Sequence, residues 1–306
     1  MAHDHLELAE QYQKELVAAG LLIQTSVMGV YGRSGVFEEV LEAFDHFVRK
    51  QGQAQNPEVM RFSPVIGRAD YLKTTHIESF PNLIGSIHSF YGKEKDHLEM
   101  LRKMLELEEW TNDLGPTELM LTPAICYPLY PTAKDTVLSE NGRFIDLMGF
   151  AFRHEPSVDP ARMQTFRMHE FVRMGTSEQA LAHRDDWLKK GAEIYQTLGI
   201  DAKPVLANDP FFGRGGRAMV VSQIEQELKY ELVTVITSEE KPTAIASSNY
   251  HLDHFSQPFN IRLADGEVAH TACFGFGLER TTLALFKKFG FDLKNWSHQT
   301  KNLLGL

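Results

Sequence analysis

The sequence predicts an α+β fold, in which helices come first and a mostly antiparallel β-sheet follows. Apolar residues recur at helical spacing in the first third of the chain, whereas short β-rich segments separated by turns dominate beyond residue 118. No internal repeat, low-complexity tract or Pro/Ser-rich linker divides the 306 residues. We therefore expect a single domain over residues 1–306, large enough to bury an ample core.

Three helices are predicted before the sheet. Residues 4–19 carry apolar side chains at helical spacing and then meet a glycine, which predicts a short helical segment within about residues 1–30. A second helix begins near Ser34, an N-cap candidate, and runs to Gly52. A third helix, over residues 96–110, has leucines on its predicted buried side, namely Leu98, Leu101, Leu105 and Leu107.

The later segments predict the sheet. An extended stretch over residues 58–66 holds Pro64, which must lie at a strand edge, end or bulge because proline has no N–H group. One long helical insert, about residues 177–198, interrupts the later strands, and glycines within 275–277 lead into a helix ending near Lys288. Strands are predicted at residues 119–130, 144–153, 165–172, 230–237, 244–250 and 260–263.

Composition excludes several classes of protein. The 41 acidic side chains outnumber the 31 basic ones, and a net charge of −10 argues against broad, sequence-independent capture of nucleic acid. No run of about 18 apolar residues exists and the first residues are polar, so we expect neither a membrane span nor export. The two cysteines form no disulfide framework, which makes a reducing cytoplasm the simplest location.

One predicted hairpin gathers charge. The strand ending in Phe-Arg153-His-Glu155 is followed, after a polar loop, by Thr-Phe-Arg167-Met-His-Glu170-Phe. Arginine can hold a phosphate bidentately and a carboxylate can accept from the amino groups of a base, so the hairpin could form the floor of a ligand site. A solvated hairpin with cross-strand ion pairs is an equally good interpretation of the residues alone.

A second pattern lies near the C-terminus, in Cys-Phe-Gly275-Phe-Gly277-Leu-Glu-Arg280. Glycines let the backbone approach a ligand closely, and an arginine in the first turn of a helix can reach an anion. Taken alone, the spaced glycines are better explained by tight packing of a strand against the following helix.

Together, the two patterns resemble the second and third signature motifs of class II aminoacyl-tRNA synthetases. Among these enzymes they are most similar to the motifs of seryl-tRNA synthetase. The extended Arg-Phe-Ser-Pro64-Val-Ile falls where the first, dimer-forming motif belongs. The likeness covers about residues 35–288. It implies a class II synthetase-like catalytic domain, an antiparallel β-sheet flanked by helices, that forms a homodimer through the region around Pro64.

The resemblance also implies roles for individual residues. Arg153 is similar to the arginine that grips the ATP α-phosphate and the amino-acid carboxylate, and Arg280 to the arginine that covers the other side of the nucleotide; both would be catalytic. Glu155 resembles the residue that reads the adenine amino group, Phe171 the aromatic that stacks on adenine, and Arg167 the arginine that reaches the terminal phosphates. The implied reaction joins an amino acid to ATP, with Mg²⁺ on the phosphates.

The sequence departs from the seryl-tRNA synthetase pattern at several positions, and these differences indicate which related family it resembles most. Only about 30 residues precede the first motif, where those enzymes carry a long tRNA-binding arm, so no tRNA partner is expected. Gly175 stands four residues after Phe171, where a glutamate would contact the substrate amino group. Ile245 replaces a magnesium-binding glutamate, so Ser248 would keep a metal-facing role while Glu231 is only a candidate for the missing carboxylate.

These departures match the amino acid:carrier protein ligases, which resemble truncated seryl-tRNA synthetases and load glycine or alanine onto the phosphopantetheine thiol of an acyl-carrier-like protein. Their active-site Zn²⁺ is held by two cysteines and a glutamate, and Cys126, Glu170 and Cys273 fit those positions. The cysteines lie 147 positions apart (273 − 126), so local spacing could not have proposed the site, and without the resemblance two inert buried thiols are favoured.

Other interpretations stay open. The chain could charge tRNA, or it could be a catalytically silent paralogue that senses an amino acid. His251 and His254 could form a second metal site, although a surface pair is favoured, and the loop from Arg214 to Arg217 could meet phosphate, an acidic carrier protein or only solvent. A Cys–His hydrolase is disfavoured because neither cysteine lies in a nucleophile turn.

Overall fold

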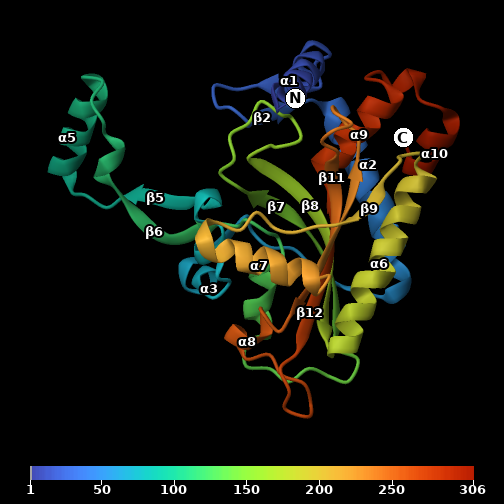
Figure 1. Ribbon diagram of the computed structural model, residues 1–306. Helices are drawn as coiled ribbons and strands as arrows, with labels where there is room; N and C mark the ends of the chain where they lie inside the picture. Colours follow the sequence, from blue (N-terminus) through green and yellow to red (C-terminus); the bar gives the residue numbers. More distant parts are fainter. Residues whose placement is uncertain (1) are drawn as a thin grey trace.

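A seven-stranded β-sheet forms the centre of the computed structural model, which describes residues 2–306 except for the side chains of residues 2–4, 214 and 215 (Figure 1). All neighbouring strands in this sheet are antiparallel apart from the first two, which are parallel. The predicted antiparallel class is therefore confirmed. In spatial order the strands are β3 (Glu58–Met60), β7 (Arg143–Phe152), β8 (Thr165–Gly175), β12 (His270–Gly277), β11 (Thr243–Leu252), β10 (Lys229–Thr234) and β9 (Lys203–Leu206).

Helices cover one face of this sheet. They are α2 (Gly35–Gly52), α6 (Ser177–Thr197) and α9 (Leu278–Phe289), and α2 begins where predicted because the Phe37 N–H donates to Ser34 Oγ at 3.2 Å. The face beneath them is aromatic, with Phe171, Phe274 and Phe276 fully buried. A Cβ at Gly191 would fall 2.3 Å from Phe274 Cζ, so this glycine lets α6 lie close to the sheet. Burying each such ring stabilises the fold by about 1.5–3 kcal/mol.

The opposite face carries the polar residues. Side chains alternate along a strand, so on β8 the neighbours of Phe171 point away from the helices, and the same holds on β12 for the neighbours of Phe274. Register places Glu170 opposite Gly275, and Val172 opposite Cys273. A second apolar cluster lies on this face, under the 3₁₀ helix η4 (Tyr127–Ala133) and α8 (Ser256–Phe259).

A smaller three-stranded sheet projects away from the centre of the molecule. It contains β4 (Val65–Gly67), β6 (Leu114–Leu121) and β5 (Ser86–Phe90), and it leads to α5 (Glu94–Leu105), which stands apart at its tip (Figure 1). A hairpin of β1 (Leu22–Gln24) and β2 (Tyr31–Arg33) lies near the N-terminal helix. The other helices are α1 (Ala2–Ala18), α3 (Arg68–Leu72), α4 (His76–Ser79), α7 (Gly213–Glu225) and α10 (His298–Leu304), with 3₁₀ turns η1 (Gln53–Gln55), η2 (Pro81–Leu83), η3 (Thr111–Asp113) and η5 (Leu293–Asn295).

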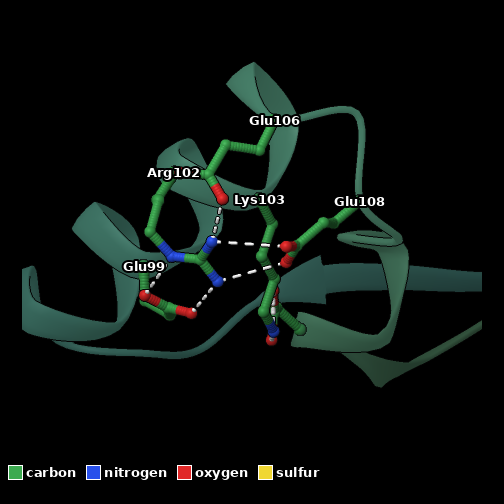
Figure 2. Close-up of polar contacts among 6 residues, drawn as sticks. Glu99, Arg102, Lys103, Glu106 and Glu108 are labelled. Atoms are coloured by element: carbon green, nitrogen blue, oxygen red, sulfur yellow. Dashed lines mark hydrogen bonds and ion pairs between the residues drawn. The ribbon is translucent and has the colours of Figure 1, made fainter.

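The prediction for α5 is wrong about burial. No side chain of this helix is buried, and Leu98 and Leu105 are 62% and 76% exposed, because the helix stands on two strands beyond the body of the molecule. Figure 2 shows the polar contacts on this helix, in which Arg102 pairs with Glu99, Glu106 and Glu108. Such exposed ion pairs contribute little to stability, because water and salt screen them.

Three predicted β segments also need correction. The strand expected at 119–130 ends at Leu121 because prolines follow, and η4 takes its place. The stretch 58–66 divides into β3 and β4 on either side of Pro64, and residues 260–263 form only isolated bridges at Arg262. None of the helices that the structure describes combines the length and apolar character needed to cross a membrane.

Candidate active site

A cationic cavity of ≈ 110 Å³ opens on the polar face of the sheet, over β8, β12, β11 and β10. Five basic side chains contribute to its lining, namely Arg153, Arg162, Arg167, Lys229 and Arg280. The pKa of Arg280 is lowered, first by burial and then by Arg162 and Arg153, which reflects the concentration of positive charge. We call this the first cavity, and its charge suits a polyanion such as a triphosphate.

Two predicted arginines are fixed in the first cavity by backbone carbonyls. Arg153 Nε donates to Pro123 O at 3.1 Å, and its guanidinium lies 5.4 Å from the centre of the Phe166 ring. Arg280 Nε donates to Ala161 O at 2.7 Å and its Nη1 to Ala244 O at 3.0 Å. Because neutral carbonyls hold them, both arginines keep their full positive charge for a ligand.

The predicted glutamate Glu155 also lines the first cavity. Its carboxylate pairs with Arg162, which lies on the loop between β7 and β8 and which the motif comparison did not single out. Gly275 and Gly277 line the cavity, as the first interpretation predicted, and the close neighbours of Gly275 lie on the adjacent strand β8 and not on the following helix. A Cβ at Gly275 would lie 2.8 Å from Met168 Cε.

Arg167 is held differently from the other arginines. Its Nη atoms donate to the two carboxylate oxygens of Glu38 at 2.5 and 2.8 Å, and its Nε donates to Glu279 Oε1 at 2.9 Å. The backbone N–H of Arg167 also donates to Glu279, at 2.6 Å. Two carboxylates therefore neutralise this guanidinium at the cavity edge, and its contact with terminal phosphates stays a prediction.

The assignments of Phe171 and Ser248 need correction, because both side chains point to the helical face. Phe171 is fully buried, with its ring centre 4.1 Å from that of Trp187, whereas Phe166 lines the first cavity. Ser248 Oγ donates to Arg184 O at 2.7 Å, whereas Ser247 lines the cavity. An odd-numbered step along a strand changes the face, and sequence spacing alone did not fix the register.

Phe166, unlike Phe171, has a glutamate four residues later. Synthetases carry a glutamate four residues after the stacking aromatic, and Glu170 stands four residues after Phe166 on the same face of β8. The four-residue spacing that the resemblance implies is therefore met by Phe166 and Glu170, and not by Phe171 and Gly175.

A second, larger cavity of ≈ 650 Å³ adjoins the first. Arg153, Met168, Lys229 and Ser247 line both. The second cavity also contains the three predicted zinc ligands, because Cys126 at the start of η4, Glu170 on β8 and Cys273 on β12 all contribute to its wall. Each of the three is at most 5% exposed.

The three side chains influence one another strongly. A hydrogen bond between the two sulfurs raises the pKa of Cys126 well above its ordinary value and lowers the pKa of Cys273 well below it. Cys273 is the better thiolate because Asn249 Nδ2 donates to its sulfur at 3.4 Å and His251 Nε2 lies 3.5 Å away. Burial, followed by the charge of Cys273, raises the pKa of Glu170 well above its usual range.

Glu170 is not fully satisfied by its neighbours, since its buried Oε2 has no hydrogen-bond partner. As the side chains stand, no group of three or more His, Cys, Asp and Glu residues within the described part of the chain surrounds a point suitable for a metal ion. The structure thus brings the predicted ligands into one cavity wall without arranging them around a metal position.

Lys229 is a buried cation at the junction of the cavities that sequence reasoning missed. Its Nζ pairs with Asp209 and, at 3.3 Å, with Glu231 Oε1. Asp209 in turn accepts from Gln223 Nε2 at 2.8 Å, which connects the strand to α7. In the sequence, the only indication of this site was that Lys229 and Glu231 alternate along one strand. The strand register was needed to show that they lie beside the cavities.

The remaining candidates are the two histidines and the basic loop. His251 Nδ1 lies 3.0 Å from Thr271 Oγ1, and His254 Nε2 lies 3.2 Å from Thr75 Oγ1. Both histidines line the second cavity, so they are not an isolated surface pair. The predicted basic loop is part of α7, where Arg217 is exposed and the side chain of Arg214 lies outside the described residues.

Comparisons with known proteins agree with this geometry. Residues 109–289 match the tRNA synthetase class II core domain (G, H, P, S and T). Amino acid–(acyl-carrier-protein) ligase 2 of Bradyrhizobium diazoefficiens is 40% identical over 95% of this chain and 87% of its own. Ligase 1 of the same organism is 38% identical, over 91% and 85% of the two chains.

A solved structure shows the same fold. Seryl-tRNA synthetase of M. kandleri, crystallised with A. aeolicus tRNASec, superposes with a TM-score of 0.81 at 20% identity. The match covers 95% of this chain and 59% of that one, so this chain spans little more than half of its length. With the motifs, the two cavities and the extent of the sequence matches, the chain belongs to the amino acid–(acyl-carrier-protein) ligases, which are built on the class II synthetase core.

Proposed function

We propose that this protein uses ATP to activate glycine or alanine and then transfers the aminoacyl group to the phosphopantetheine thiol of an acyl-carrier-like protein. The observation that supports it most directly is the junction of the two cavities at Arg153, where a cationic site meets one lined by thiols and a carboxylate. The names of the two bacterial relatives describe the same overall reaction.

In the first step, a carboxylate oxygen of the amino acid attacks the α-phosphorus of ATP. The bond from this phosphorus to the oxygen bridging the β-phosphate breaks, and pyrophosphate leaves with the electron pair. Arg153 lines both cavities, so its guanidinium can neutralise charge on the amino-acid carboxylate and on the α-phosphate. A fixed donor of this kind typically contributes about 10²–10³-fold to the rate.

Three residues of the first cavity would hold the nucleotide. Phe166 offers a ring face to adenine, Glu155 can accept from the adenine amino group, and Arg280 adds positive charge from the start of α9. Arg167 is already paired with Glu38 and Glu279, so we propose that it reaches the terminal phosphates only by leaving one of these carboxylates.

We propose that Cys126, Glu170 and Cys273 hold Zn²⁺ in the second cavity. The donor set fits zinc, which accepts thiolate and carboxylate ligands, and the partnerless Oε2 of Glu170 is costly to bury without a cation. When bound, zinc would take the amino group of the substrate at its open position. Asn249 and His251 would orient the sulfur of Cys273.

In the second step, the thiol sulfur of the carrier's phosphopantetheine attacks the carbonyl carbon of the adenylate. The bond from this carbon to the phosphate oxygen breaks, AMP leaves, and the thiol proton passes to solvent. The adenylate is already a good acyl donor and a thiol is a competent nucleophile, so positioning supplies most of what the step needs. We assign no general base.

The remaining proposals concern assembly and location. We propose a homodimer formed through the region around Pro64, Mg²⁺ accompanying the ATP phosphates, and a cytoplasmic location that keeps both cysteines reduced. We expect no charging of tRNA.

Pyrophosphate exchange tests this function, with each of the amino acids assayed before and after treatment with a zinc chelator. Exchange confined to glycine or alanine, lost with the chelator and restored by Zn²⁺, supports the proposal, as does a matching mass increase on a carrier protein. Absence of exchange with every amino acid would favour the silent, amino-acid-sensing alternative. Exchange accompanied by charging of tRNA, without loading of any carrier, would favour the synthetase alternative.

A further inference from the structure

A hairpin outside the first cavity supports one of the cavity's walls. The loop between β7 and β8, residues 153–164, contributes five residues to the lining, namely Arg153, Glu155, Ala161, Arg162 and Met163. The turn between β1 and β2, residues 25–30, is described in full and binds this loop, although none of its residues lines the cavity. The hairpin also precedes residues 109–289, which match the class II core domain. It therefore supports the nucleotide site from a segment that comes before the matched core.

Gln164 forms the contact between the hairpin and the loop. Its backbone N–H donates to Gly29 O and its side-chain Nε2 donates to Met28 O, both at 2.8 Å. Its carbonyl oxygen accepts from the backbone N–H of Arg153 at 2.9 Å, which closes the base of the loop. Gln164 is 4% exposed, so water cannot readily replace a hydrogen bond that is lost here. One residue thus connects the turn of the hairpin to the backbone of Arg153.

The same loop holds the second predicted arginine of the site. Arg280 Nε donates to Ala161 O at 2.7 Å, and Ala161 lies three residues before Gln164. The second strand of the hairpin adds a further contact, since Arg33 Nη2 lies 3.2 Å from Oε1 of Glu279, the residue before Arg280. The two predicted arginines therefore both depend on how the loop lies against the hairpin.

Gly29 lets the turn approach the loop closely. Its φ is +76°, in the left-handed region that glycine adopts without steric cost. A Cβ at this position would lie 3.3 Å from Gln164 Cγ and 3.5 Å from Arg162 O, so a side chain here would press on the loop. Gly20 provides a contrast, because its φ is +69° but a Cβ there would meet nothing among the described residues within 4 Å beyond its chain neighbours.

We propose that Gln164 is a positioning residue for ATP, and that it holds the loop of the first cavity in place by binding the β1–β2 turn. Gln164 acts through the backbone of Arg153 and through the loop carbonyl that holds Arg280. A loop that is already ordered spares the nucleotide the entropy cost of ordering it, so the hairpin raises affinity for ATP without contacting it. This inference rests on the proposed function, because it concerns the ATP that the ligase reaction consumes.

Gln164→Met tests the side-chain contact, because methionine is of similar length but cannot donate a hydrogen bond. Calorimetric titration of the full chain, with Mg²⁺ and the non-hydrolysable ATP analogue in which methylene joins the α- and β-phosphates, measures nucleotide affinity. We expect this affinity to fall by about two- to tenfold, which corresponds to one lost hydrogen bond. In pyrophosphate exchange, KM for ATP should rise by a similar factor while KM for the amino acid stays unchanged. A purely structural role would not separate these two constants.

Gly29→Ala and Gly20→Ala test the turn itself. Both substitutions impose a similar left-handed backbone strain, but only the one at residue 29 would press on the loop. We expect weaker analogue binding in Gly29→Ala alone, accompanied by faster amide hydrogen exchange over residues 153–164. This pair also carries the test if Gln164→Met does not fold.

Unchanged analogue affinity in Gln164→Met, with normal circular dichroism, would overturn the inference, as would equal losses of affinity in the two glycine variants. The titration contains no amino acid and needs no turnover, so the proposed function can fail separately. A chain whose analogue affinity falls as expected, but which never exchanges pyrophosphate, would refute the proposed function alone. A chain that exchanges pyrophosphate while Gln164→Met and Gly29→Ala bind the analogue normally would refute only this inference.

Discussion

The two adjoining cavities differ in the charge of the side chains that line them. In the first cavity, Arg153 and Arg280 are held by neutral carbonyls, so a rigid site presents excess positive charge. In the second, two sulfurs and the carboxylate of Glu170 crowd one wall, and one oxygen has no partner. The first cavity therefore presents Arg153 and Arg280 to an anion as they stand, whereas the second contains a buried oxygen that the proposed cation would satisfy. The difference lets each half be disrupted separately.

Arg153→Ala should have the largest effect, because this side chain lines both cavities. We expect pyrophosphate exchange to fall by at least about 10²–10³-fold with every amino acid, through kcat as well as KM, since the guanidinium faces charge that develops at the α-phosphate. A variant that changed only which amino acid is preferred would contradict the role proposed for Arg153 at the junction of the two cavities.

Cys273→Ala should disable the second cavity alone. Zinc content and amino-acid activation should both be lost, because a thiolate ligand disappears, while nucleotide affinity and the dimer should be retained. Metal analysis, exchange assays and nucleotide titration measure these three properties, and Cys126→Ala is the matched variant. A zinc-free variant that activates amino acids normally would refute the metal assignment.

Phe166→Ala and Phe171→Ala should separate the two faces of β8. Loss of the cavity aromatic should weaken nucleotide binding by about 1–3 kcal/mol with little change in stability. Loss of the buried ring that stacks on Trp187 should instead lower the free energy of unfolding by about 3–5 kcal/mol. Nucleotide titration and chemical denaturation of both variants measure these two effects. Weaker nucleotide binding in Phe171→Ala, with a loss of stability in Phe166→Ala, would restore the sequence-based assignment of Phe171.

Leu105→Ala should have the smallest effect and serve as a baseline outside both cavities. Its side chain is 76% exposed on α5, so the free energy of unfolding should change by no more than about 0.5 kcal/mol, with nucleotide and zinc binding unaltered. Destabilisation by about 2 kcal/mol or more in denaturation experiments would show that this leucine is covered in solution.

The sequence predicted the fold class and the main elements of the catalytic face, because turn residues and the motif hairpin are local signals. It erred where one residue of register decides a side chain's direction: Phe171 and Ser248 face the helices, whereas Phe166 and Ser247 line the first cavity. Lys229 escaped notice because its partner Asp209 comes from a separate segment of the chain. Periodicity alone cannot locate such pairs.

Two further outcomes depended on information beyond local pattern. The leucines of α5 have ordinary amphipathic spacing, yet no side chain of this helix is buried within the described chain, so periodicity predicted a buried face that does not exist. Cys126 and Cys273 are far apart in sequence, and only the tertiary packing of η4 over the sheet brings them to one cavity wall. The family resemblance, and not local spacing, therefore predicted this pair.

X-ray absorption at the zinc edge of the purified protein tests the central claim most directly. The account predicts about one zinc per chain with two sulfur neighbours at about 2.3 Å and oxygen or nitrogen neighbours at about 2.0–2.2 Å, and a gain in the lighter neighbours when glycine or alanine is added. Protein that activates an amino acid without zinc, or zinc that has no sulfur neighbours, would contradict it.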